Sequence, residues 1–322
     1  MLLEDVPGVD AGALHAARMA ERGEVDAARK MLEAELVAAT GDVRRDWFLA
    51  LARWSEQFQP DTAPRAWRML AVEYEDDALV QHAVLAEASS LQRDTELRRD
   101  TIERLRTITG SEGRSWRLEE ARLLLDEVEA ATPDGAVATG DAQTKAMRAA
   151  DLLRQLVRVE YDSPSSIDAR LLLAESLQSL GNLSAAAGHL QEAWSLDRAR
   201  GDVGLRLADV LESQGQQVEA RRVLGALAAE GVSGRAARLE VAGRLAEAGD
   251  ADAAVSLLRQ AAQAGDLDVS GRTVLAELLA RQGDEAGAER LYEPMLRGAQ
   301  PPAGVLLSAA VFEGRRVEIA AS

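Results

Sequence analysis

Small and apolar residues recur with a period of 34 residues along the second half of the chain. Four glycines mark this period, and alanine stands seven residues before and five residues after each of them. Apolar spacings of three and four residues on both sides of each glycine predict two amphipathic helices joined by a short turn. Glycine suits the turn because it readily adopts the left-handed conformation that ends a helix. These repeated positions are Ala174, Gly181, Ala186, Ala208, Gly215, Ala220, Ala242, Gly249, Ala254, Ala276, Gly283 and Ala288.

One such helix pair cannot bury its apolar face alone, so the pattern predicts an all-α array of stacked pairs. Small residues in both helices of a pair let the two backbones approach closely. The region 165–302 holds four regular repeats, at 167–200, 201–234, 235–268 and 269–302.

The first part of the chain, residues 1–164, carries the same pattern less regularly. Divergent repeats are predicted at 9–42, 44–77, 79–113 and 114–164. The last of these has longer helices, and its segment TPDGAVATGDAQ predicts an inserted surface loop over 132–143, because Pro, Gly, Thr and Asp favour turns. Residues 303–322 form a terminal half repeat with Ala310 at the small position and no second helix.

These positions resemble the tetratricopeptide repeat family, in a bacterial type. In the repeat 167–200 the resemblance rests on Leu173, Ala174, Leu177, Ala186, Leu190 and Ala193, and the next three repeats follow the same scheme. The family's tryptophan at position 4 and its proline near the end of the repeat are missing. The resemblance implies a right-handed α-solenoid of about eight antiparallel helix pairs plus the half repeat.

The same resemblance implies a concave groove lined by positions 2, 5, 9, 12 and 13 of the first helices. In the regular repeats these positions form a leucine stripe flanked by carboxylates, which predicts binding of a basic and apolar segment of another protein. Alternatively, the leucines only pack between neighbouring first helices and the acids only face solvent. The candidate groove residues are Leu171, Glu175, Gln178, Leu205, Asp209, Glu212, Leu239, Glu247, Thr273, Glu277 and Arg281, with Leu307 in the half repeat.

Six of the eleven aromatic residues lie between positions 47 and 74. Trp47, Trp54 and Trp67 fall at core positions of the repeat 44–77, and the alternative is an aromatic hot spot for a partner. Phe48 falls at groove position 5 in that register, so it is a further candidate for partner binding.

The 54 acidic and 37 basic side chains give a net charge of −17. This charge argues against binding to nucleic acid and to anionic membrane surfaces, since both rely on Lys and Arg. No apolar run is long enough to insert into a membrane, and the first residues are no signal peptide. The chain as given is therefore predicted to be cytoplasmic, or periplasmic if an upstream signal peptide has been removed. Lysine occurs only at Lys30 and Lys145, which is typical of a GC-rich bacterial genome.

Residues for catalysis or metal binding are sparse. The chain has no cysteine, and His15, His82 and His189 fall in different repeats, at no spacing that suits a metal ion. Acidic pairs such as Glu119 and Glu120 are typical of solvated helix faces. The sequence predicts no enzyme activity, no metal and no cofactor.

The end of the sequence places Val311, Phe312, Val317 and Ile319 at an open end of the array. Either a partner covers them or the chain is a fragment of a longer protein, and we expect a fragment. The predicted function is that of a protein–protein interaction scaffold or adaptor. The alternatives are a periplasmic scaffold for exopolysaccharide or outer-membrane assembly, and the interaction arm of a larger enzyme whose catalytic domain is absent.

Overall fold

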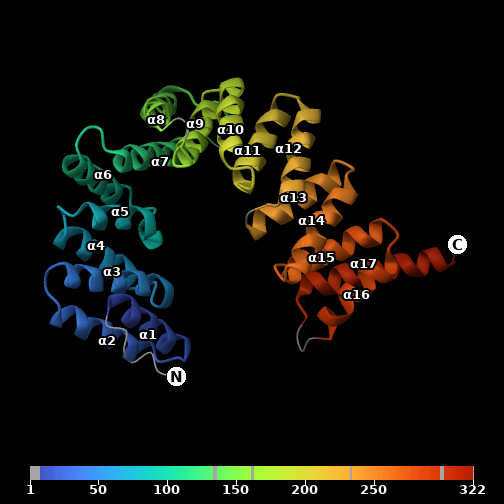
Figure 1. Ribbon diagram of the computed structural model, residues 1–322, viewed down its shortest axis with the longest axis horizontal. Coiled ribbons are helices and arrows are strands. Elements are labelled where there is room, and N and C mark those ends of the chain that lie inside the picture. The colour runs from blue at the N-terminus through green and yellow to red at the C-terminus, as the bar shows by residue number, and fades with distance from the viewer. Residues whose placement is uncertain (1–7, 133–135, 161–162, 233, 298–300, 322) are drawn as a thin grey trace. The chain divides into compact units, whose positions relative to one another are not determined.

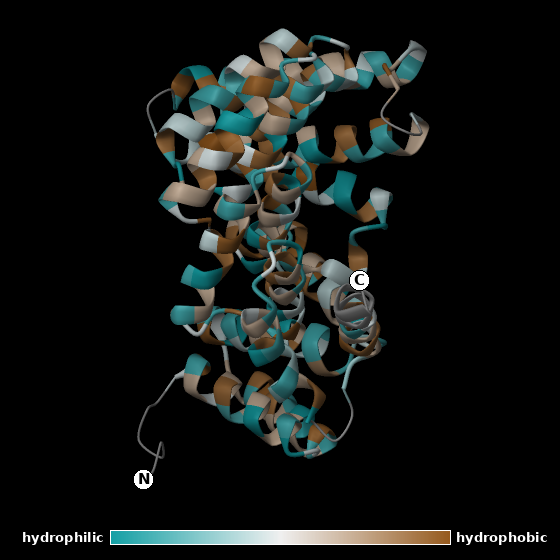
Figure 2. Ribbon diagram, turned by 90° about the vertical axis from the view of Figure 1, so that its right-hand side faces the viewer, coloured by the Kyte–Doolittle hydropathy of each residue, from teal (hydrophilic) through white to brown (hydrophobic). Residues whose placement is uncertain are grey.

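The computed structural model describes residues 8–132, 136–160, 163–232, 234–297 and 301–321, and the side chains of residues 315–321 lie outside the description. Within these ranges every regular element is a helix, which confirms the predicted all-α fold (Figure 1). Brown and teal residues alternate along individual helices, as expected for amphipathic helices (Figure 2).

The first helices are α1 (Val9–Glu21), α2 (Val25–Ala38), α3 (Gly41–Phe58), α4 (Ala63–Glu73), α5 (Ala78–Glu87), the 3₁₀ turn η1 (Ser89–Leu91), α6 (Thr95–Thr109), α7 (Arg114–Ala131) and α8 (Gly140–Val159). The regular region follows with α9 (Ser166–Ser179), α10 (Leu183–Leu196), α11 (Gly201–Ser213), α12 (Gln217–Glu230), α13 (Arg235–Glu247), α14 (Ala251–Gln263), α15 (Val269–Arg281), α16 (Glu285–Leu296) and α17 (Ala303–Ala321).

The chain separates into two compact units. The N-terminal unit comprises residues 1–131 and 151–156, and the C-terminal unit comprises residues 132–150 and 157–322. The predicted repeat 114–164 is thus divided between the units, and α8 contributes residues to both.

In the C-terminal unit, consecutive helices pack as pairs, α9 with α10, α11 with α12, α13 with α14 and α15 with α16. The first helices from α11 onward also contact each other, α11 with α13, α13 with α15, and α15 with α17. The small residues explain these close contacts, because the alanines seven before and five after each repeat glycine are 0% exposed. Stacking therefore buries the faces that the 34-residue period marks in the sequence.

The turn between the helices of a regular repeat is built from the glycine and the residue after it. Gly181, Gly215, Gly249 and Gly283 all have positive φ, between 74° and 87°. The next residue donates its backbone N–H to the first helix, as Asn182 does to the oxygen of Leu177 at 2.8 Å. The side chain of that same residue caps the second helix in three repeats, where Asn182, Asp250 and Asp284 each accept a backbone N–H.

In the N-terminal unit, one core runs from α1 to η1. Trp47, Trp54 and Trp67 belong to it, with exposed fractions of 8%, 4% and 0%, so these rings fill the core. A second cluster joins Ile102, Leu105, Trp116, Leu123 and Leu152.

The inserted loop is shorter than the sequence predicts. Helix α8 begins at Gly140, so residues 140–143 are helical, and residues 133–135 of the predicted loop lie outside the described residues. The end of the loop is also held in place, since Ala138 is 1% exposed and donates its N–H to the oxygen of Ser179 at 2.7 Å. Threonine and glycine at 139–140 thus start a helix instead of extending the loop.

The end of the chain differs from the prediction in one residue. Phe312 is 6% exposed and lies against Tyr292, with ring centroids 5.5 Å apart, so it does not lie at an open end. Val311 is 50% exposed, as predicted, and the side chains of Val317 and Ile319 lie outside the described residues. Phe312 is buried because it comes seven residues after Val305 on the face that α17 packs against the preceding repeat.

Candidate functional site

The leucine stripe predicted for the regular repeats is largely covered. Leu205 is 6% exposed, and Leu171 and Leu239 are half-buried. For Leu205 the structure therefore supports the alternative interpretation, in which the leucine packs between helices. The stripe offers a partner less apolar surface than the sequence predicts.

Three of the carboxylates beside the stripe are paired with arginines of the next first helix. Glu175 accepts from Arg206 at 3.0 Å. Arg244 reaches both Asp209, at 2.6 Å, and Glu212, at 2.8 Å. These two arginines offset part of the negative charge that was predicted to select a basic partner.

The other predicted groove residues lie in different environments. Thr273 bonds the oxygen of Val269 at 2.8 Å within its own helix. Gln178 is half-buried and Glu247 is exposed. Glu277 and Arg281 line a hollow, together with Leu307.

Phe48 does not face a groove, so that prediction is wrong. Its side chain is 3% exposed and belongs to the core of the N-terminal unit. The first helix of this repeat runs one residue later than assumed, so that Ala52, which is 0% exposed, takes the small position. With this register, position 5 is Leu49, and Phe48 moves to the core position 4.

A groove of about 720 Å³ lies along α1 and α3, and we call it the α1–α3 groove. Its floor and walls are mostly small or apolar, and its rim carries charged and amide side chains. Sequence reasoning missed it, although positions 2, 5 and 9 of the repeat 9–42 are Asp10, Ala13 and Ala17. The lining residues are Gly8, Val9, Asp10, Ala11, Ala13, Ala17, Asp46, Leu49, Ala50, Arg53, Trp54, Gln57, Phe58 and Leu79.

Two of the charged groups at the rim already have partners. Arg53 bonds Glu87 at 2.8 Å, and this hydrogen bond raises the pKa of the guanidinium. Asp46 pairs with Arg45 at 2.8 Å. No described cation lies within ion-pair distance of Asp10, and its charge acts on Arg53 at longer range, where it helps to raise the pKa of the guanidinium.

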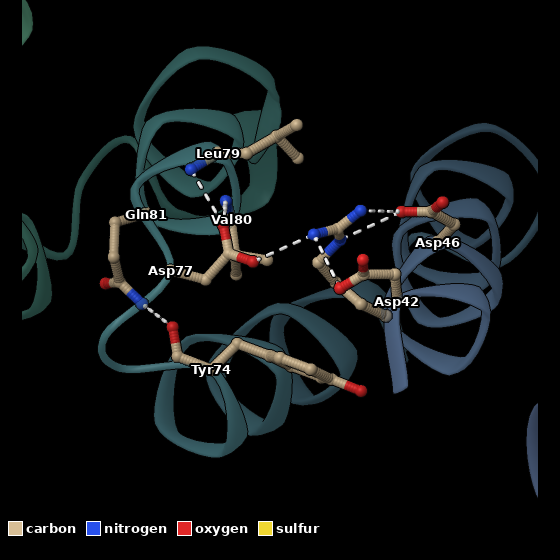
Figure 3. Close-up of polar contacts among 8 residues, drawn as sticks. Asp42, Asp46, Tyr74, Asp77, Leu79, Val80 and Gln81 are labelled. Carbon is tan, nitrogen blue, oxygen red and sulfur yellow. Dashed lines mark hydrogen bonds and ion pairs between the residues drawn. The ribbon is translucent and has the colours of Figure 1, made fainter. Parts of the chain in front are cut away.

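A network around Arg45 fixes the edge of the groove at the start of α5 (Figure 3). Asp77 caps α5 by accepting the N–H groups of Leu79, at 2.9 Å, and Val80, at 3.2 Å. The same carboxylate also accepts from Arg45 at 3.2 Å, which links α5 to Asp46 on α3. The cap therefore sets the position of Leu79, which lines the groove and is 53% exposed.

A second hollow, of about 330 Å³, lies between α15 and α17. Tyr292 of α16 lines it, is 3% exposed, and has no described hydrogen-bond partner for its hydroxyl group. Burial, with a smaller contribution from Glu277, raises the pKa of this hydroxyl to about 12. The hollow also borders Leu307 and Val311, which are 69% and 50% exposed.

The described residues show no grouping of three His, Cys, Asp or Glu side chains that could hold a metal ion. His15 and His82 are exposed, and His189 lies 3.4 Å from Glu192. None of the described helices has the length and apolar character to cross a membrane.

Comparison with known proteins identifies the fold. No family model and no curated protein sequence matches the chain. Among solved structures, a tetratricopeptide repeat protein from Parabacteroides merdae superposes with a TM-score of 0.53 at 12% identity, over 83% of this chain and 97% of that one. The fold is that of tetratricopeptide repeat proteins. The chain is thus an array of helical repeats with this fold.

Two other tetratricopeptide-type structures are similar over most of this chain. The human IFIT1 dimer with PPP-AAAA matches with a TM-score of 0.48 and 12% identity, over 90% of this chain and 73% of that one. The APC/C hetero-tetramer Cut9-Hcn1 matches with a TM-score of 0.44 and 13% identity, over 94% of this chain and 62% of that one.

Proposed function

We propose that this tetratricopeptide repeat chain is an interaction scaffold that holds an apolar and basic segment of another protein in the α1–α3 groove. The observation that carries the proposal is the groove itself, a hollow of about 720 Å³ lined by small and apolar side chains together with the exposed carboxylate of Asp10. The same groove would serve an adaptor, an export scaffold or the interaction arm of a larger enzyme.

The floor of the groove suits a close approach by a peptide. Ala13 and Ala17 are one helical turn apart on α1, and their short side chains leave room for the backbone of a partner. Leu49, Trp54 and Phe58 of α3 also line the groove, where Phe58 is half-buried and Leu49 and Trp54 are core residues that border it. Pockets of this kind hold the anchoring side chains that give most of the binding energy in protein interfaces.

The rim favours a basic group on the partner. Asp10 is exposed and unpaired among the described residues, whereas the charge of Arg53 is held by Glu87. An exposed ion pair contributes only about 0–1 kcal/mol. Asp10 should therefore contribute more to the choice of partner than to the affinity. The net charge of −17 also favours a protein over a nucleic acid as the partner.

The experiment selects peptides from a phage-displayed random library on the immobilised full chain. We expect enriched sequences to combine an aliphatic or aromatic residue with Lys or Arg. Ala17→Trp fills the groove and should weaken binding of the selected peptides at least tenfold. Ala34→Trp places the same side chain at an exposed position of α2 and serves as the matched control.

Two further variants separate the contributions of the rim and the regular repeats. Asp10→Asn should weaken binding up to about fivefold at low salt, with a smaller effect at high salt. If Ala17→Trp binds the selected peptides as the wild type does, the groove is not the site. If a Leu171→Ser and Leu239→Ser double variant abolishes binding instead, the site lies along the regular repeats.

A further inference from the structure

The α1–α3 groove is bounded by two helices that run in the same direction. Helices α1 and α2 pack against each other across a short turn, and so do α2 and α3, so each pair is antiparallel and α1 is parallel to α3. Gly12 lies against Trp47, since a Cβ added at Gly12 would meet this ring, and both residues belong to the first half of their helices. One end of the groove therefore lies at the starts of α1 and α3, and we call it the starting end. The opposite end is the far end.

The starting end is negatively charged. Asp10 and Asp46 are the carboxylates that line the groove, and both lie in the first two turns of their helices. The guanidinium of Arg45 is shared by three carboxylates, which are Asp46 at 2.8 Å, Asp77 at 3.2 Å and Asp42 at 3.3 Å (Figure 3). Three carboxylates around one guanidinium leave a net negative charge, and the exposed Asp10 adds to it. This end of the groove therefore attracts a cationic group of a partner.

The far end is lined by side chains without charge, which are Ala17, Trp54, Gln57 and Phe58. Phe58 is half-buried, and its ring lies against Trp54 with the centroids 5.5 Å apart. Arg53 lies between the two ends, where Glu87 holds its charge. The short side chain of Ala17 leaves room beside Phe58, so the far end suits an aromatic or large aliphatic side chain.

The dimensions of the groove suit an extended chain better than a helix. The lining residues of α3 run from Asp46 to Phe58, which is about 18 Å at a rise of 1.5 Å per residue. The volume of about 720 Å³ spread over this length corresponds to a mean cross-section of about 40 Å². A helix about 10–12 Å in diameter has a cross-section of about 80–110 Å². One strand occupies about 48 Å², from the spacings of about 4.8 Å between strands and about 10 Å between sheets.

Hydrogen-bonding groups in the lining favour the same conformation. Trp54 is 4% exposed, and its indole N–H has no described hydrogen-bond partner. Gln57 is exposed, and its amide both donates and accepts hydrogen bonds. A helix pairs most of its own N–H and C=O groups internally, whereas an extended segment leaves these groups free. Trp54 and Gln57 therefore complement the backbone of an extended chain.

We propose that the α1–α3 groove binds an extended segment with Lys or Arg at the starting end, beside Asp10, and an aromatic or large aliphatic residue at the far end, beside Phe58. About five residues, at about 3.4 Å each, span the length of the groove. This inference rests on the proposed function and adds the conformation, length and orientation of the bound segment.

The probes come from two phage-displayed libraries in which Lys and Phe are fixed with three random residues between them, one library for each chain direction. The strongest binder is synthesised with capped ends and a fluorescein label, and its Kd for the full chain is measured by fluorescence anisotropy. Proline at one or more of the three intervening positions should leave Kd within threefold, because an extended segment accommodates its fixed φ. A loss of more than tenfold at all three positions would contradict the extended conformation.

Two measurements locate the ends of the bound peptide. Asp10→Lys should weaken binding at least fivefold at low salt, and a peptide with Glu in place of its Lys should bind this variant at least threefold more tightly than the original peptide does. Asp26→Lys is the matched control, because Asp26 is an exposed carboxylate in the first turn of α2, as Asp10 is in that of α1. Its Kd should stay within twofold of the wild type. Benzoylphenylalanine in place of the peptide's Phe should crosslink to residues 54–58, as located by mass spectrometry.

The outcomes separate this inference from the proposed function. If Ala17→Trp leaves the affinity of these peptides unchanged, the groove is not the site and both proposals fail. If Ala17→Trp abolishes binding but the charge exchange at Asp10 restores none of it, or the crosslink maps to the starting end, the groove still binds the peptide and the inferred orientation is wrong. If only the fully random library yields binders, the inferred pattern of Lys and Phe is wrong.

Discussion

The residue that follows each turn glycine acts on two helices at once. In three regular repeats its backbone N–H closes the first helix and its side-chain oxygen caps the second. The glycine before it has a positive φ, which only glycine adopts without cost. The glycine and the residue after it therefore determine where the first helix of a pair ends and where the second helix begins.

The turn glycines should be costly to replace for a backbone reason alone. Gly215 has φ 76°, and a Cβ added there would meet nothing within 4 Å, so Gly215→Ala should destabilise by roughly 1–2 kcal/mol through left-handed strain. Gly188 lies inside α10, without a positive φ and with open space around it. Gly188→Ala should stabilise by about 0.5–1 kcal/mol. Thermal unfolding followed by circular dichroism measures both, and shifts of the same sign would contradict the assigned turn.

The capping side chains give a second measurable contrast. Asp250 accepts the N–H of Ala253 at 3.2 Å, whereas Gln216 at the equivalent position makes no side-chain cap. Asp250→Ala should therefore cost about 1 kcal/mol, and Gln216→Ala should change stability little. The comparison uses the urea midpoint of each variant, and an equal loss for both would show that the caps contribute nothing specific.

At single positions, predictions from the sequence were correct in the regular repeats and wrong where the 34-residue period is interrupted. The alanines and glycines of the regular repeats could be predicted because every position is seen four times. Phe48 was misplaced because its repeat is seen once, and a change of one residue in the turn moves each side chain by 100° around the helix. The pairing of Arg244 with Asp209 and Glu212 was also missed, because long side chains reach across helices in ways that spacing along one helix does not reveal.

Within a helix pair, the close approach of the two backbones depends on small residues. Ala208 on α11 and Ala220 on α12 are both 0% exposed. Replacing either with Leu should overpack the pair and cost about 1–3 kcal/mol. Ala229 is an exposed position of α12, so Ala229→Leu should be nearly neutral. Unfolding midpoints of the three variants test this, and a neutral Ala208→Leu would mean that the pair packs in another register.

The bounds of the irregular helices could be predicted less well than those of the regular ones. Composition suggested a loop to residue 143, but Thr139 and Gly140 precede a stretch rich in good helix formers, so α8 starts earlier. The location of the apolar groove on α1 and α3 also escaped prediction. Its floor is made of alanines, which the sequence pattern uses equally for close packing between helices.

At the level of the whole chain, the division into two units predicts where a protease acts first. The boundary falls after Ala131, and the segment between α7 and α8 has no Lys or Arg, so trypsin cannot report on it. Subtilisin should make its first cut between residues 132 and 139, because this connection is long and contains small and polar residues. Mass spectrometry of the first fragments gives the position. A first cut inside α9 to α16 would mean that the regular repeats are less stable than their burial indicates.

The fold class followed from the sequence because an array needs only a repeated local pattern, without any pairing between distant segments. The candidate binding surfaces did not follow, since they depend on which side chains neighbouring repeats leave uncovered. Ala310 on α17 illustrates this, because it has the same residue type as Ala276 but is exposed, whereas Ala276 is 0% exposed.

The double role of the residue after the turn glycine also determines where foreign sequence can be inserted. An extra residue between Gly249 and Asp250 would separate the end of α13 from the start of α14, because one side chain and its own N–H serve both. Connections outside the regular repeats vary in length, as the stretch before α8 shows. A fluorescent reporter or an affinity tag is therefore best inserted into the connection before α8, where the packing of one repeat does not depend on its spacing from the next.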